Sequence, residues 1–131
     1  MEFRDNQAIY LQIADIMCEN ILSGAWTPGS RIPSIRETAE ASQVNPNTVM
    51  RTYGFLEEKG IIRNQRGVGF FLSDGADEIT RKLKRETFES RELPRMFRIM
   101  ELLSIRIDDL QGIYDAHRDA RHGAPDKETR P

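Results

Sequence analysis

Apolar residues recur at helical spacing in the N-terminal half of the chain and predict three helices. The first is expected over residues 8–23, with Gly24 as its C-terminal cap. A short second helix is expected over residues 35–41. A third is expected over residues 46–59, where valine, tyrosine and leucine recur at i, i+4 and i+7.

The residues at the two later helix starts support this interpretation. Ser34 precedes Glu37 by three residues, which is the spacing of a capping box. Asn45 is a favourable N-cap, and Pro46 then occupies the first helical position, where its missing N–H costs nothing. The two helices are therefore separated by a turn of about four residues.

Two short β-type segments follow, at residues 61–64 and 69–72, and flank a polar turn that contains Gly67. Helix, short helix, turn, helix and hairpin is the order of a winged helix-turn-helix. In that motif the N-terminal residues of the second helix of the pair meet base edges in the major groove. The residues expected there are Asn45, Pro46, Asn47, Thr48 and Arg51.

The helical pattern resumes after Gly75 with more charge and fewer apolar residues. Helices are expected over residues 77–91, from Pro94 onward, and over residues 107–116. The segment 117–131 is polar without periodicity, which predicts a disordered tail.

The predicted fold class is therefore mainly α with a small β-wing. We expect a winged helix-turn-helix domain over residues 1–75, a helical dimerisation domain over 76–116 and the tail over 117–131. The helices expected after Gly75 have a thin stripe of apolar residues, and these are too few to bury the stripe within one chain. Pairing of two chains is expected around Leu83, Phe88, Met96, Met100 and Leu103.

Charge changes this picture locally rather than globally. The chain of 131 residues has a formal net charge of −2, so its overall charge does not indicate a nucleic-acid partner. Residues 31–66, however, carry six Lys and Arg against four Asp and Glu. The positive charge is thus concentrated around the predicted reading head, and Arg36, Asn47, Arg51 and Arg66 are expected on one surface.

Other functional classes lack their residues. No run approaches the roughly 20 apolar residues of a membrane span, and the N-terminus does not resemble a signal peptide. The single cysteine, Cys18, is expected to pack as a small apolar residue. His117 and His122 are too sparse for a metal site, and no nucleophile–base pair or phosphate loop is present. We therefore expect a cytoplasmic protein that is not an enzyme and needs no metal or cofactor.

Four segments resemble the DNA-binding domain of GntR-family bacterial transcription regulators. They are Ile9–Ile13, Gly24–Glu37, Val44–Val49 and Arg66–Phe71, and their spacings also agree with that family. The resemblance implies that Arg36, the segment 45–48 and a wing tip at Gly67 contact DNA. Met50 departs from the family, because many members carry arginine there, whereas this chain has its arginine at position 51.

The rest of the chain resembles the short helical tail of the YtrA-like subfamily, through Arg85–Phe88, Glu92–Pro94, Met100–Leu103 and Asp108–Leu110. This tail implies a homodimer and is too small for the effector pocket of larger members, so an effector stays unknown. The expected function is that of a dimeric repressor on a palindromic operator of double-stranded DNA. The alternative is a winged-helix module that contacts another protein without binding DNA.

Overall fold

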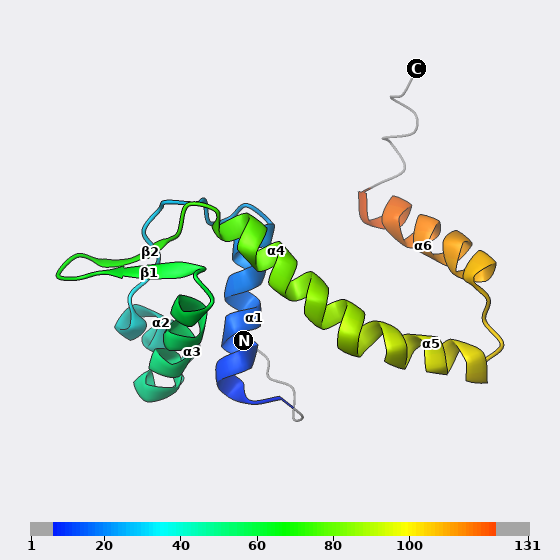
Figure 1. The fold of residues 1–131 in the computed structure, drawn as a ribbon, viewed down its shortest axis with the longest axis horizontal. Helices are drawn as coiled ribbons and strands as arrows, with labels where there is room; N and C mark the ends of the chain where they lie inside the picture. Colours follow the sequence, from blue (N-terminus) through cyan, green and yellow to red (C-terminus); the bar gives the residue numbers. More distant parts are fainter. Residues whose placement is uncertain (1–6, 123–131) are drawn as a thin grey trace, which may run out of the picture. The chain divides into compact units, whose positions relative to one another are not determined.

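The computed structural model describes residues 7–122, which form two compact units, the first ending at Glu86 and the second beginning at Thr87. The fold class, mainly helical with a small β-wing, is confirmed. The elements in chain order (Figure 1) are α1 (Ile9–Leu22), α2 (Ile35–Ser42), α3 (Pro46–Glu58), β1 (Ile62–Gln65), β2 (Gly69–Leu72), α4 (Ala76–Thr87), the π-helical turn η1 (Phe88–Glu92), α5 (Leu93–Leu102) and α6 (Ile107–His122).

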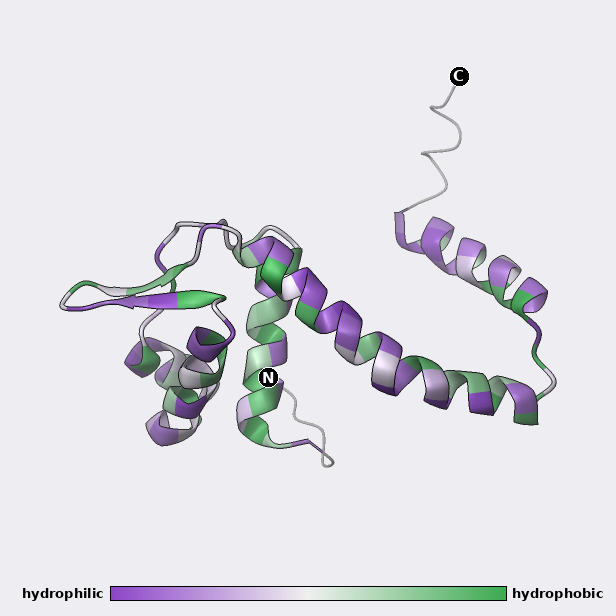
Figure 2. Ribbon diagram, viewed as in Figure 1, coloured by the Kyte–Doolittle hydropathy of each residue, from purple (hydrophilic) through white to green (hydrophobic). Residues whose placement is uncertain are grey.

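The core of the first unit lies where α1 packs against α3 and the base of the hairpin. Figure 2 shows α1 as largely hydrophobic along its length. Each large aliphatic side chain buried here contributes roughly 1.5–3 kcal/mol of transfer free energy. The core is built mainly from Ile13, Met17, Ile21, Val49, Tyr53, Leu56, Ile61, Ile62 and Leu72.

The hairpin is antiparallel, with Ile62 opposite Leu72 at its base and Gln65 opposite Gly69 near its tip. Only the base is anchored in the core, because Ile62 and Leu72 are buried while the residues toward the tip are exposed or half-buried. An isolated bridge between Arg31 and Phe71 adds a short third segment beside β2. The wing therefore extends from the core as a two-stranded ribbon.

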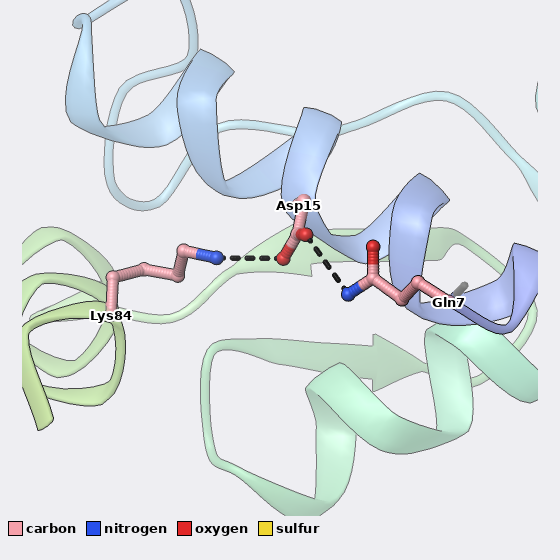
Figure 3. Close-up of polar contacts among 3 residues, drawn as sticks. All are labelled: Gln7, Asp15 and Lys84. Atoms are coloured by element: carbon pink, nitrogen blue, oxygen red, sulfur yellow. Dashed lines mark hydrogen bonds and ion pairs between the residues drawn. The ribbon is translucent and has the colours of Figure 1, made fainter. Parts of the chain in front are cut away.

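The first part of α4 belongs to the first unit. Ala76 and Thr80 are fully buried, and Leu83 packs against the core. Lys84 forms an ion pair with Asp15 of α1 at 2.7 Å, and Gln7 donates a hydrogen bond to the other carboxylate oxygen of Asp15 at 3.2 Å (Figure 3). The domain boundary expected after Gly75 thus lies ahead of a packed stretch of helix, whereas the division into units falls after Glu86.

The chain passes from α4 into α5 without the break expected at Pro94. The N–H of Leu93 donates to the carbonyl of Phe88, five residues earlier, which is the hydrogen bond of a π-helix. Proline lacks an N–H and its ring clashes with the carbonyl four residues before it. The widened π-helical turn accommodates that clash, so the helical run continues instead of restarting.

The prediction of a disordered tail from residue 117 is wrong for residues 117–122, which continue α6. This helix is stabilised by local polar contacts rather than by an apolar stripe. Gln111 and Arg118 both contact Asp115, while Arg121 and His122 lie in the last turn, where positive charge favours the helix dipole. Residues 123–131 lie outside the described part of the chain.

Candidate nucleic-acid interface

Arg36 is presented by a rigidly capped helix. The Glu37 N–H donates to Ser34 Oγ at 3.0 Å, and the Ser34 N–H donates to Glu37 Oε1 at 2.9 Å, which completes the predicted capping box. These bonds lower the pKa of Glu37 below its ordinary value, and the bond with the Ser34 backbone N–H has the larger effect. The Arg36 side chain is 90% exposed, and its Nε lies 3.8 Å from Glu40 Oε1. The helix start is fixed, while the guanidinium projects into solvent.

The start of α3 forms a second exposed polar group. The Asn47 N–H donates to Asn45 Oδ1 at 2.8 Å, and Pro46 occupies the first turn as predicted. Asn45, Pro46 and Asn47 are exposed, whereas Thr48 is half-buried. A helix N-terminus carries partial positive charge, so this end of α3 suits a phosphate or another acceptor.

Tyr53 joins α2, α3 and the wing. Its hydroxyl donates to the Pro33 carbonyl at 2.6 Å and lies 2.8 Å from Thr38 Oγ1. Its ring meets Phe70 of β2 edge-on, with centroids 4.9 Å apart. Burial raises the pKa of Tyr53, so the phenol stays neutral and keeps its proton for the bond to Pro33. Tyr53 is part of the core, with 1% exposure.

Arg51 lies toward α1 rather than projecting freely. Its Cζ sits over the Tyr10 ring, 3.9 Å from the ring centroid. The preceding residue, Met50, is 55% exposed and faces solvent. Successive residues on an α-helix are turned by about 100°, which explains the different directions of the two side chains. The contact joins two helices that are distant in sequence, so helical periodicity, which relates residues within one helix, did not predict it.

The predicted turn between the two strands forms around Gly67 at the wing tip. Gly67 has φ +78°, a left-handed value that costs other residues energy, and the Val68 N–H closes the turn by donating to the Gln65 carbonyl. Arg66 and Gly67 are both exposed.

Two further arginines flank the wing and were not among the predicted contacts. Arg63 Cζ lies over the Phe71 ring, 5.1 Å from its centroid. The Arg31 guanidinium is packed so closely on Gly69 that a Cβ there would lie 2.8 Å from Arg31 Nε. The isolated bridge from Arg31 to Phe71 also places this arginine beside β2.

The residues predicted for DNA binding therefore all belong to the first unit. Seven of them are exposed and Thr48 is half-buried; they are Arg36, Asn45, Pro46, Asn47, Thr48, Arg51, Arg66 and Gly67.

The predicted dimerisation residues are distributed differently. Leu83 packs on the core of the first unit, and Met100 is buried in the second. Phe88 and Leu103 are 49% and 64% exposed, and Met96 is half-buried. Further exposed apolar side chains of the second unit are Phe97, Ile99, Leu102, Ile107, Ile113 and Tyr114.

The described residues offer little for other chemistry. Over residues 7–122, no group of three or more His, Cys, Asp or Glu side chains could hold a metal ion. Burial raises the pKa of the Cys18 thiol to about 11, which leaves it protonated and unreactive. In the same range no helix has the length and apolar character to cross a bilayer.

Comparison with protein families matches residues 9–72 to the bacterial regulatory proteins of the gntR family. The uncharacterized HTH-type transcriptional regulator YhcF of Bacillus subtilis is 42% identical over 91 residues, which is 67% of this chain and 75% of that protein. The chain belongs to the GntR family.

Two further similarities place this GntR chain among regulators with a short C-terminal part. The HTH-type transcriptional repressor YtrA of Bacillus subtilis is 44% identical over 73 residues, or 56% of each protein. The crystal structure of a GntR-family regulator from Bacteroides thetaiotaomicron matches with a TM-score of 0.71 and 40% identity, over 87% of this chain and 99% of that one. The resemblance to YtrA-like regulators is thus confirmed. The protein is a transcription regulator with a DNA-binding helix-turn-helix, and its relatives are regulators rather than enzymes.

Proposed function

We propose that this GntR-family protein is a repressor that binds a palindromic operator as a homodimer. The observation that carries the proposal is that Arg36 of α2 and the polar start of α3 are both exposed in the same unit. The starts of the two helices are held by hydrogen-bonded caps, and Tyr53 couples the two helices. A backbone that is already ordered loses little entropy when DNA binds.

In this proposal α3 enters the major groove with Asn45, Pro46, Asn47 and Thr48 leading. Side-chain amides and arginines are the groups that read base edges there. The wing, with Arg66 and Gly67 at its tip, approaches the neighbouring minor groove. Gly67 favours this approach, because nothing lies within 4 Å of the position that its Cβ would occupy.

The homodimer is proposed to form through the second unit. Large apolar side chains on α5 and α6 are exposed, with Leu102 at 75% and Leu103 at 64%. Burial of apolar surface is the main favourable term in protein association. Figure 2 shows green segments recurring along α5 among polar ones.

Two observations support repression: the protein is small, and its relative YtrA is named a repressor. A small dimer that covers a promoter blocks polymerase without further parts. Its place of action would be the cytoplasm, where a bacterial chromosome lies. The effector, if one exists, has no assigned site.

Selection of bound sequences from a pool of random DNA duplexes tests the proposal. We expect the full chain to enrich an inverted repeat whose half-sites lie about one helical turn, or a multiple of it, apart. Binding should weaken steeply with salt, as phosphate contacts require. Failure to bind any duplex at low salt would favour the alternative, a winged-helix module that contacts another protein.

A further inference from the structure

An aromatic pair at the junction of α1 and α3 carries two cations. The rings of Tyr10 and Phe55 meet edge-on, with centroids 6.4 Å apart. Arg51 Cζ lies 3.9 Å from the centroid of the Tyr10 ring, and Lys59 Nζ lies 5.6 Å from that of Phe55. Positions 51, 55 and 59 are spaced by four, so these side chains follow one stripe of α3.

The backbone of Tyr10 is fixed relative to this stripe. Thr52, the residue after Arg51, is fully buried and donates a hydrogen bond from Oγ1 to the Tyr10 carbonyl at 2.8 Å. The ring that carries the guanidinium is therefore tied to the helix that carries Arg51. This arrangement restrains the arginine at both ends of its side chain.

The contact leaves the hydrogen-bonding groups of Arg51 available. A guanidinium is planar, and its five N–H groups point outward in that plane. An aromatic ring attracts the cation electrostatically without accepting those N–H bonds. Arg51 can thus meet a phosphate through its N–H edge while it stays against Tyr10.

We propose that Tyr10 is a positioning residue for DNA binding, whose ring holds the Arg51 guanidinium ready to contact a backbone phosphate. This inference rests on the proposed function, that the surface around α3 binds DNA. An arginine side chain loses rotamer freedom when it is ordered. Because Tyr10 already restrains Arg51 in the free protein, Arg51 loses less rotamer entropy when DNA binds.

Arg36 provides the contrast within the same unit. Its side chain is 90% exposed, and its ion pair with Glu40, at 3.8 Å, is itself exposed to solvent. An exposed pair of this kind holds geometry weakly. The two arginines therefore differ in preorganisation, and Tyr10 should matter for Arg51 and not for Arg36.

The test compares three replacements of Tyr10 in the full chain. Tyr10→Phe keeps the ring, and Tyr10→Leu removes it but keeps apolar bulk. Incorporation of pentafluorophenylalanine at position 10 keeps the ring while reversing its attraction for a cation. We expect Tyr10→Phe to bind a random duplex at low salt within about twofold of the parent. The leucine and pentafluoro variants should bind about three- to tenfold more weakly.

A double-mutant cycle with Arg51→Gln separates positioning from folding. If Tyr10 acts through Arg51, Tyr10→Leu should have no further effect on affinity in the Arg51→Gln background. Equal losses in both backgrounds, or a pentafluoro variant that binds like the phenylalanine variant, would overturn the inference. Because the pentafluoro variant keeps the ring volume, a leucine variant that fails to fold leaves the question answerable.

The proposed function has its own readout in the same titrations. Arg51→Gln should lower the slope of log K against log salt by about 0.9 if Arg51 meets a phosphate. A lowered slope with no effect of Tyr10 would refute the positioning role alone. An unchanged slope would overturn both the phosphate contact and the role of Tyr10, and absent duplex binding would overturn the proposed function.

Discussion

The hydroxyl of Tyr53 donates a hydrogen bond to the carbonyl of Pro33 at 2.6 Å. A phenol has one proton to donate, so Thr38 Oγ1, 2.8 Å away, donates its own proton to Tyr53. Tyr53 belongs to α3, whereas Pro33 precedes α2 and Thr38 lies within α2, the helix that presents Arg36. One buried hydroxyl thus couples the two helices of the predicted reading head.

Tyr53→Phe should lower the free energy of unfolding by about 1–2 kcal/mol, because it removes both bonds and leaves a carbonyl without its donor. Urea denaturation measures the loss. Tyr114→Phe is the matched control, since Tyr114 is 57% exposed. It is expected to change stability by less than about 0.5 kcal/mol. Equal effects of the two variants would show that the bonds of Tyr53 do not stabilise the fold.

The cap of α2 should make stability depend on pH. Bonds from Ser34 lower the pKa of Glu37 below its ordinary value of 4.5. The carboxylate therefore stabilises the fold fully above about pH 4.5, and this contribution disappears as the pH falls through the lowered value. Glu37→Gln should be less stable than the parent at pH 7, with the gap closing in acid. Glu40→Gln is the charge-matched control, and a gap for Glu37→Gln that persists at pH 2 would contradict the account.

Local signals made the first unit predictable. The capping box at Ser34, the Asn45–Pro46 helix start and the glycine at the wing tip each satisfy a backbone requirement within a few residues. The structure has them as expected. Those features depend on neighbours in sequence, so one sequence is enough to read them.

Contacts between distant segments were not predictable in the same way. The stack of Arg51 on Tyr10 and the burial of Thr80 depend on how helices pack, which periodicity does not specify. The π-helical turn before Pro94 lets the helix continue despite the clash that a proline causes in a regular α-helix. The end of α6 was missed because it has polar contacts, such as that of Arg118 with Asp115, and no apolar periodicity.

Gly67→Val should weaken DNA binding more than it destabilises the protein. A β-branched residue is strained at φ +78° and adds bulk at the wing tip, which is exposed. Gly24→Val is the matched control, because Gly24 has φ +84° and equally open space but follows α1 away from the predicted contacts. Both variants should lose similar melting temperature, whereas only Gly67→Val should lose affinity for the selected duplex. Equal affinities would exclude the wing from the interface.

A chain ending at Glu86 should be folded and monomeric, whereas the full chain should form the proposed dimer. This end point keeps Ala76, Thr80 and Leu83, which pack in the first unit, and removes the exposed apolar side chains of α5 and α6. Sedimentation velocity measures both forms. In the full chain, Leu103→Asp should also weaken the dimer, because it places a charge on a side chain that we propose is buried by pairing. A truncated chain that still dimerises would remove the second unit from the interface.

We propose that the two arginines presented by α2 and α3 have different tasks. Base contacts discriminate between sequences, and phosphate contacts add affinity with little sequence information. Arg36 is exposed on a capped helix and has only an exposed ion pair with Glu40, whereas Arg51 is held against Tyr10. We therefore propose that Arg36 contacts a base edge and that Arg51 contacts a phosphate.

Titration of Arg36→Ala and Arg51→Ala against the selected operator and a scrambled duplex, at several salt concentrations, tests this assignment most directly. Arg36→Ala should reduce preference for the operator by about 1–3 kcal/mol and leave binding to the scrambled duplex much less affected. Arg51→Ala should weaken both alike and lower the salt slope by about 0.9. If Arg51→Ala instead removes the preference while Arg36→Ala weakens both duplexes equally, the assignment is reversed and the account is wrong.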